Sequence, residues 1–374
     1  MSEQAKAEQV FDLTLTEEQR ITRESLIRFA ETELRANSRD ADEAAKAPEG
    51  FYDKTMDLGL SILPIPEKCH GAGMPRSPMS NVLNAEDLGK GDMSLALGAL
   101  TPLSFVNAVL DNGTEAQQEK YLSPLASETF VPATIALMEP RATFEATELQ
   151  TTAKKDGGSY IINGEKCMVA LGGSAKFILV IAAIEGAGVG AFVVEQGADG
   201  VSIKEEEYMG LRPVELSRVT LENVKVDASA KLGEDEKEFD SQRLIDFGRL
   251  GVCALSLGVC EAVLEYVTEY ANERVAFGEP ISHRQSVAFM IANIAIELEA
   301  MRLMVYRAAS RAENGLDFHK EAYLARVICA EKAMEIGTNG VQILGGHGFI
   351  REHMVELWYR NLRAVGILEG AAVI

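Results

Sequence analysis

The chain has 374 residues, with 36 basic and 57 acidic side chains and a formal net charge of −21. This length exceeds the ~250–300 residues that one hydrophobic core supports, so two or three packed units are expected. Hydrophobic residues make up 47% and charged residues 25%, which is typical of a globular protein. The acidic excess argues against nucleic acid and against an anionic membrane surface as partners.

Three features of the sequence predict a cytoplasmic protein without a membrane span. No apolar run reaches the ~18–20 residues that cross a bilayer, and Met1–Gln4 lacks the start of a signal peptide. The cysteines are odd in number, scattered, and without a C-x-x-C pair, which indicates reduced thiols. They are Cys69, Cys167, Cys253, Cys260 and Cys329.

Residues 1–130 are predicted to form an N-terminal all-α domain. Thr16-Glu17-Glu18-Gln19 fits a capping box, in which the Thr hydroxyl and the Gln side chain bind free amides at a helix start. The helical period returns at 82–88 and 117–122, after a stretch rich in proline and glycine at 64–78.

Residues 131–234 are predicted to form a small β-barrel or sandwich. Asn163-Gly164 lies between two short apolar runs, which is a strong local signal for a β-hairpin. Residues 177–181 and 191–194 are apolar runs of strand length, and 219–226 roughly alternates as a half-buried strand does.

Residues 235–374 are predicted to form a C-terminal bundle of long helices. The helical period holds over 243–270, 285–314 and 320–344, and helices of this length suit an antiparallel bundle that also packs across subunits. The expected fold is therefore a multi-domain α+β protein, ordered as helices, a sheet and long helices.

The first long helix is followed by Arg274-Val275-Ala276-Phe277-Gly278-Glu279-Pro280-Ile281, and Gln285 starts the next. Arg274 near a helix C-terminus complements the helix dipole, so the segment could be only a helix cap. A guanidinium also matches phosphate geometry, so an anion clamp for a diphosphate is the alternative.

A second motif runs from Gln342 to Phe349 and contains Gly345-Gly346-His347-Gly348. It follows a helix and not a strand, so it is not a dinucleotide-binding fingerprint of the Rossmann kind. It is either a helix–helix turn or a place where the backbone approaches a ligand closely.

The combination of motifs resembles the acyl-CoA dehydrogenase family over nearly the whole chain. The pattern is Arg-x-x-Phe-Gly-x-Pro-Ile-x-x-x-Gln, then Gln-x-x-Gly-Gly-x-Gly-Phe, then Leu-Glu-Gly at 368–370. Further similar segments are Ile65-Pro66-Glu67, Lys120-Tyr121-Leu122, Met138-Glu139-Pro140, Tyr160 to Gly164, Gly172-Gly173 and Met209-Gly210-Leu211-Arg212.

The resemblance implies an FAD enzyme that dehydrogenates an acyl-CoA to a trans-2-enoyl-CoA and passes electrons to an electron-transferring flavoprotein. Glu369 matches the family's catalytic carboxylate, a role that requires burial to raise the pKa of the group toward neutrality. Its neighbours in the sequence are apolar or small. Asp246 and Arg249 match positions that bind CoA, and Gly370 matches a substrate contact; a helix-face ion pair is the other interpretation of Asp246 and Arg249. The family's alternative base position holds Gly248, which cannot act as a base.

The resemblance also implies that FAD is shared between subunits of a homo-oligomer, a tetramer or a dimer. The residues that match positions holding the adenosine and diphosphate of FAD are Arg274, Phe277, Gln285, Gln342 and Gly346.

The sequence departs from the family around the flavin ring. Hydroxyl and aromatic positions of the family are occupied by Met138, Met168, Ala170 and Ala371, and Arg141 and Phe144 add bulk. Each lost hydrogen bond is worth on the order of 1 kcal/mol, so we expect FAD to bind more loosely than is usual in the family. The alternatives are a flavin-poor partner subunit in a hetero-oligomer and a related enzyme with divergent chemistry.

No metal site is expected, because His347, Glu352, His353 and Glu356 lack ligand spacing. Acyl chain length does not follow from the sequence. The chain ends at Ile374, where the family usually continues into a last helix.

Overall fold

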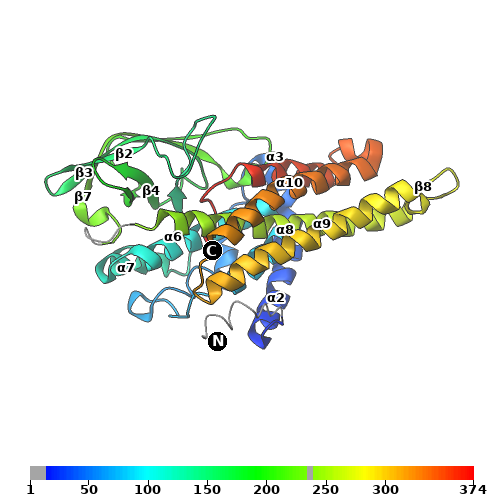
Figure 1. Cartoon of the computed structure of the whole chain (residues 1–374), viewed down its shortest axis with the longest axis horizontal. Helices are drawn as coiled ribbons and strands as arrows, with labels where there is room; N and C mark the ends of the chain where they lie inside the picture. Colours follow the sequence, from blue (N-terminus) through cyan, green and yellow to red (C-terminus); the bar gives the residue numbers. More distant parts are fainter. Residues whose placement is uncertain (1–13, 234–238) are drawn as a thin grey trace.

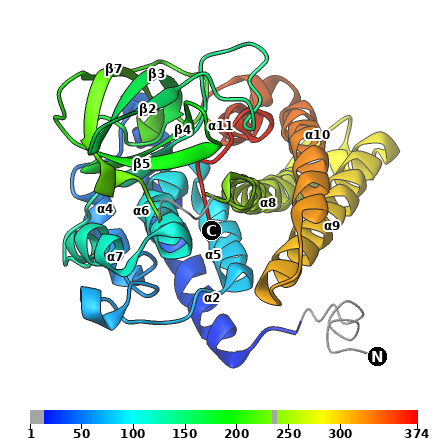
Figure 2. The same ribbon diagram turned by 60° about the vertical axis from the view of Figure 1, so that its left-hand side comes forward.

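The computed structural model describes residues 14–233 and 239–374. The predicted domain boundary at 234 and the N-terminal segment Met1–Gln4 lie outside these residues. Figure 1 shows a sheet at one end of the molecule and a pair of long helices that reach the other end, with the shorter helices beside them. Figure 2 shows α8 lying between the N-terminal helices and the pair α9 and α10.

The N-terminal part is helical, as predicted. The predicted capping box starts α2: Thr16 Oγ1 accepts from the Gln19 N–H at 3.2 Å, and Gln19 Oε1 accepts from the Thr16 N–H at 3.0 Å. The helices are α2 (Glu17–Phe29), which continues through a π-helical turn (Ala30–Arg35) into α3 (Ala36–Ala44), then α4 (Phe51–Thr55), α5 (Pro78–Gly91), α6 (Met93–Asn112) and α7 (Glu115–Leu122).

Sequence patterns missed most of α6, because this helix is apolar on every side and buried between the sheet and α8. Together with α8 it is long and apolar enough to cross a membrane, contrary to the expectation that no segment would qualify. Burial explains the composition, since 94% of the apolar window in α6 and 78% of that in α8 lie inside the protein.

The middle part is one seven-stranded sheet in the order β1-β4-β2-β3-β7-β6, with β5 paired to β4. It encloses a second apolar core that is separate from the main one. The strands are β1 (Ala133–Ala136), β2 (Thr152–Asp156), β3 (Ser159–Val169), β4 (Phe177–Ile184), β5 (Val189–Glu195), β6 (Val201–Glu205) and β7 (Ser217–Asp227).

The predicted hairpin at Asn163-Gly164 is wrong. Both residues lie inside β3, and the chain turns earlier, between β2 and β3. The glycine instead serves a register shift between β3 and β7, where its φ is 151°. A Cβ at Gly164 would lie 2.6 Å from the Cα of Thr151, so only glycine fits this close approach.

The C-terminal part contains the three predicted long helices, α8 (Ser241–Glu273), α9 (Gln285–Glu313) and α10 (His319–Leu344). A short hairpin of β8 (Val275–Ala276) and β9 (Glu279–Pro280) joins α8 to α9. After α10 come a 3-10 turn (Gly345–Phe349), α11 (Val355–Leu362) and a second 3-10 turn (Arg363–Gly366). The last residues, from Leu368 to Ile374, return into the main core.

Candidate active site

Glu369 lies between two long helices, where two arginines hold its carboxylate. Arg249 on α8 places Nε 3.0 Å from Oε2, and Arg326 on α10 places Nε 3.5 Å from Oε1. Arg326 also donates from Nη2 to the carbonyl of Leu368 at 2.9 Å. All three charged side chains are at most 15% exposed. The carboxylate is therefore a largely buried, doubly paired group.

The backbone around Glu369 fits closely against its neighbours. A Cβ at Gly248 would lie 2.8 Å from the Cα of Gly370, so the glycine on α8 lets this segment approach the helix. On the other side, the N–H of Glu369 points at the sulfur of Met138, 3.3 Å away. A methionine of the predicted flavin-ring region thus contacts the predicted base directly.

The residues next to Glu369 in the sequence are apolar, as expected, but the surroundings of its carboxylate are not. Leu368 and Ala372 are buried and apolar, as expected. The carboxylate itself faces Arg249, which was predicted to bind CoA, and Arg326, which sequence analysis did not select. Arg326 lies 43 residues before Glu369 on another helix, and no local pattern links the two.

Asp246 is buried and already has partners. Its carboxylate lies 3.0 Å from Nδ1 of His319, accepts from Nε2 of Gln242 at 3.0 Å, and is 3.9 Å from Nη1 of Arg249. Burial raises the pKa of Asp246, and the hydrogen bond and charge of His319 partly offset that shift. A CoA group that binds Asp246 must therefore compete with His319.

The two predicted FAD motifs meet at the end of the bundle away from the sheet (Figure 1). Tyr270 in the last turn of α8 is joined to Nδ1 of His347 through its hydroxyl, at 2.8 Å. The predicted residues are all exposed there: Arg274, Phe277, Gln285, Gln342 and Gly346. In a single chain the structure does not bring them to Glu369.

The backbone of these motifs is strained at one turn and open to the surroundings at the other. Phe277, which is 96% exposed, has φ 57°, and the next residue, Gly278, has φ 87°, so a bulky side chain sits in a strained turn. A Cβ at Gly345 or at Gly346 would meet no atom within 4 Å, which leaves this turn open to a ligand. Within the described residues, the Arg274 guanidinium makes no ion pair. These groups fit the adenosine diphosphate half of FAD.

The predicted ring side of the FAD site rests on a buried ion pair. Lys166 on β3 is fully buried, and its Nζ donates to the carbonyl of Leu137 at 2.9 Å and to Glu139 at 3.1 Å. Burial lowers the pKa of Lys166 to about 8. Two residues further along, Met168 has φ 53°, and Leu171 has φ 52°. The backbone of this segment is therefore irregular at both residues.

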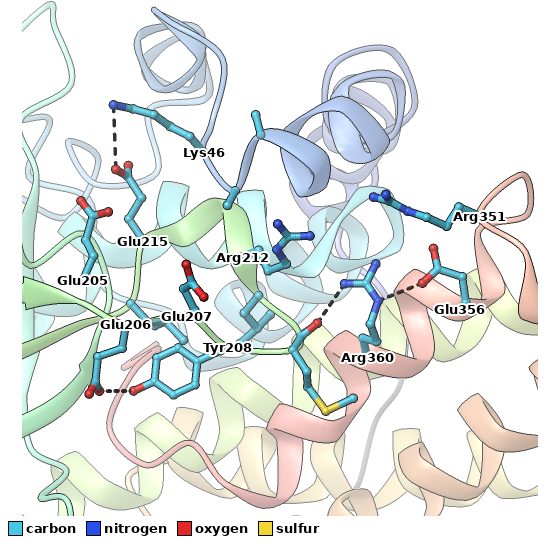
Figure 3. A pocket seen from close by; sticks show the side chains of 15 residues that line it. Lys46, Glu205, Glu206, Glu207, Tyr208, Arg212, Glu215, Arg351, Glu356 and Arg360 are labelled. Atoms are coloured by element: carbon cyan, nitrogen blue, oxygen red, sulfur yellow. Dashed lines mark hydrogen bonds and ion pairs between the residues drawn. The ribbon is translucent and has the colours of Figure 1, made fainter.

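A cleft of about 930 Å³ lies elsewhere, between the end of α3, the segment 205–216 and α11 (Figure 3). Two ion pairs join residues that line it: Arg360 with Glu356 at 2.8 Å, and Lys46 with Glu215 at 3.9 Å. Among the described residues that line it, none is a predicted site residue. The cleft is thus separate from the Glu369 site.

No group of three or more His, Cys, Asp or Glu side chains that could hold a metal ion occurs within residues 14–233 and 239–374. The two histidines considered above bind tyrosines: His347 binds Tyr270, and Nδ1 of His353 lies 2.6 Å from the hydroxyl of Tyr266.

Three family descriptions match successive parts of the chain. They are the N-terminal domain of acyl-CoA dehydrogenase over residues 16–129, its middle domain over 134–224, and its C-terminal domain over 240–374. The short-chain specific acyl-CoA dehydrogenase of Megasphaera elsdenii is 34% identical over 91% of both chains. The chain belongs to the acyl-CoA dehydrogenase family. The resemblance and fold class inferred from the sequence are thereby confirmed.

Other members of the acyl-CoA dehydrogenase family agree with this assignment. The CarC subunit of the caffeyl-CoA reductase-Etf complex of Acetobacterium woodii is 35% identical over 96% of both chains. The structure of butyryl-CoA dehydrogenase from M. elsdenii is similar with a TM-score of 0.87 and 32% identity, over 96% of this chain and 95% of that one. The structure of PigA with FAD and proline has the same TM-score, 25% identity and the same coverage. The family is one of oxidoreductases, and FAD is its supported cofactor.

Proposed function

We propose that this protein interconverts an acyl-CoA and a trans-2-enoyl-CoA, with Glu369 as the base that accepts the α-proton. Bound FAD would supply the acceptor for the β-hydrogen, which leaves the substrate as hydride. The observation that carries the proposal is the Glu369 carboxylate, largely buried between α8 and α10 in the segment that matches the family's catalytic position. Gly248 offers no second base beside it.

A homo-oligomer that completes the FAD site is part of this proposal. The diphosphate motifs lie at the far end of the bundle from Glu369 within one chain, so a second copy would supply them. The long helices carry exposed apolar side chains that a partner would cover. They are Phe289, Ile296 and Leu303 on α9, seven residues apart, and Tyr323, Leu324 and Val327 on α10.

The relatives support one choice of redox partner. The CarC subunit belongs to a complex with an Etf, which supports an electron-transferring flavoprotein as the redox partner of this chain. Because CarC is named a reductase, the same residues would serve the reverse reaction, in which Glu369 returns the proton to the α-carbon. A cytoplasmic location is also proposed, and it is supported by five free, buried cysteines.

Glu369→Gln tests the base. The amide keeps the shape of the side chain but cannot accept the proton, so flavin reduction by butyryl-CoA should fall by ~10²–10⁴-fold. Butyryl-CoA is the first probe, because a similar protein is a short-chain enzyme. The affinity for butyryl-CoA should change little. Because the variant leaves two arginines without a counter-charge, a melting curve checks that it is still folded. Wild-type reduction rates in the variant would refute the role of Glu369.

Arg274→Ala tests the cofactor site. Removing the guanidinium should strip FAD from the purified protein, since a charge-assisted partner of the diphosphate is lost. Arg284→Ala, in the same loop but paired with Glu279 at 3.0 Å, is the matched control and should keep FAD. Equal FAD occupancy in both variants and the wild type would contradict the cross-subunit site. A wild type that binds acyl-CoA without reducing flavin would instead favour the partner-subunit alternative.

A further inference from the structure

Arg326 is an unusual residue for the interior of a helix bundle. Its side chain is only 9% exposed, and burying a guanidinium is costly unless it is paired and hydrogen-bonded. It has one ion-pair partner within the described residues, the carboxylate of Glu369. Nη2 binds the Leu368 carbonyl, while Nη1 is buried without a hydrogen-bond acceptor. The hydrogen bonds of Arg326 therefore converge on the two residues at the proposed base.

Arg249 and Arg326 each contact a different oxygen of the Glu369 carboxylate. Nε of Arg249 lies near Oε2, and Nε of Arg326 lies near Oε1, so the two oxygens are held from two different helices. The contact from Arg326 to the preceding carbonyl also fixes the backbone from which the carboxylate extends. Position and orientation of the carboxylate are thus determined together.

We propose that Arg326 is a positioning residue, which orients the Glu369 carboxylate for proton abstraction. This inference rests on the proposed function. It adds a residue on α10 to those that act on the substrate or position the base, and it explains why the Arg326 side chain is buried.

Arg326 and Arg249 differ in the number of acidic groups that they contact. Arg249 is shared, because Nη1 lies 3.9 Å from Asp246, which also binds His319. The aromatic ring of Tyr323 lies 5.8 Å from the guanidinium of Arg249. Arg326 contacts no acid other than Glu369 in the described part of the chain. Its charge is therefore the less compensated of the two.

The test compares Arg326→Gln and Arg326→Lys with the wild-type holoenzyme. Anaerobic stopped-flow measurements at pH 7 follow flavin reduction over a range of butyryl-CoA concentrations. The limiting rate of Arg326→Gln should fall about tenfold, because the base is misplaced, with little change in butyryl-CoA affinity.

Lys332→Gln and the conservative variant make the comparison specific. Lys332→Gln removes a cation two turns along α10 that binds Glu297 and Glu335, and its limiting rate should match the wild type. Arg326→Lys keeps the charge but lacks the planar fork of donors that serves both the carboxylate and the Leu368 carbonyl. Its limiting rate should therefore fall, but less than that of Arg326→Gln.

A folded, FAD-loaded Arg326→Gln variant with the wild-type limiting rate would overturn the inference. If that variant does not fold, Arg326→Lys decides: a lower rate at unchanged affinity supports positioning, and a wild-type rate overturns it. Melting temperatures of the single and double Arg326→Gln and Glu369→Gln variants give a readout independent of activity. Coupling between them is expected, and additive losses would refute the pairing even if the proposed reaction were wrong.

Discussion

Lys166→Met removes the buried cation at the predicted ring side of the FAD site. Lys166 is fully buried, and its ammonium binds Glu139 and the Leu137 carbonyl. Glu139 in turn accepts from the N–H groups of Gln150 and Thr151 at 2.8 and 2.7 Å. The Lys166–Glu139 ion pair thus holds in place the segment in which Met138 contacts Glu369. Methionine has a similar length but offers neither the charge nor the donors.

The expected loss follows from the partner left behind. Removing one member of a buried ion pair costs about 3–5 kcal/mol, because the other charge stays buried without compensation. Glu139 keeps its two backbone donors, and Nε of Arg141 lies 3.4 Å away, so we expect the lower end, about 3 kcal/mol. Urea unfolding of the holoenzyme at pH 7, followed by circular dichroism, measures this loss.

The double variant with Glu139→Gln is the control. Because it removes both charges, it should regain at least half of the stability that Lys166→Met loses. Burial lowers the pKa of Lys166 to about 8 from its ordinary 10.5, so only the unfolded chain is protonated between these values. The stability contributed by Lys166 should therefore rise with pH over this window, and the variant should lose that slope. Equal unfolding free energies of the wild type and Lys166→Met would refute the reasoning.

Two further substitutions test the close packing at Glu369 and the strained turn at the FAD motif. Gly248→Ala places a Cβ 2.8 Å from the Cα of Gly370 and should displace Glu369, which lowers the rate of flavin reduction by about 10²-fold in stopped-flow assays. Retained activity would show that the segment can move freely. Phe277→Gly relieves a left-handed φ of 57° and should raise the free energy of unfolding by about 1 kcal/mol, yet weaken FAD binding measured by flavin fluorescence. A stabilised variant with unchanged FAD affinity would contradict the role of the exposed ring.

Features encoded by neighbouring residues were predictable from the sequence. The Thr16–Gln19 capping box and the three long helices of the bundle depend on side chains three or four positions apart, and the structure contains them. Helix α6 was largely missed, because a helix buried on all sides shows no apolar face. The Asn163-Gly164 signal failed because pairing with β7 and the approach of Thr151 override the local turn preference.

The residues of the candidate site also fall into those that the sequence could predict and those that it could not. Glu369, Arg274 and Gly346 were selectable because they lie in contiguous motifs that resemble a family. Arg326 and the Lys166–Glu139 pair were not, since each contact joins segments that only the fold brings together. Their roles depend on burial, and the spacing of residues along the sequence does not indicate that these side chains are buried.

The central claim is that Glu369 removes the α-proton of an acyl-CoA, for which bound FAD would be the acceptor of the β-hydride. An anaerobic titration of the FAD-loaded protein with butyryl-CoA tests it most directly, with absorbance of the oxidised flavin as the readout. The wild type should bleach as the ligand is added, while Glu369→Gln should bind the same ligand and stay yellow on the same timescale. Oxidised flavin in the wild type across a panel of acyl-CoA and enoyl-CoA ligands, or bleaching of the variant at the wild-type rate, would contradict the claim.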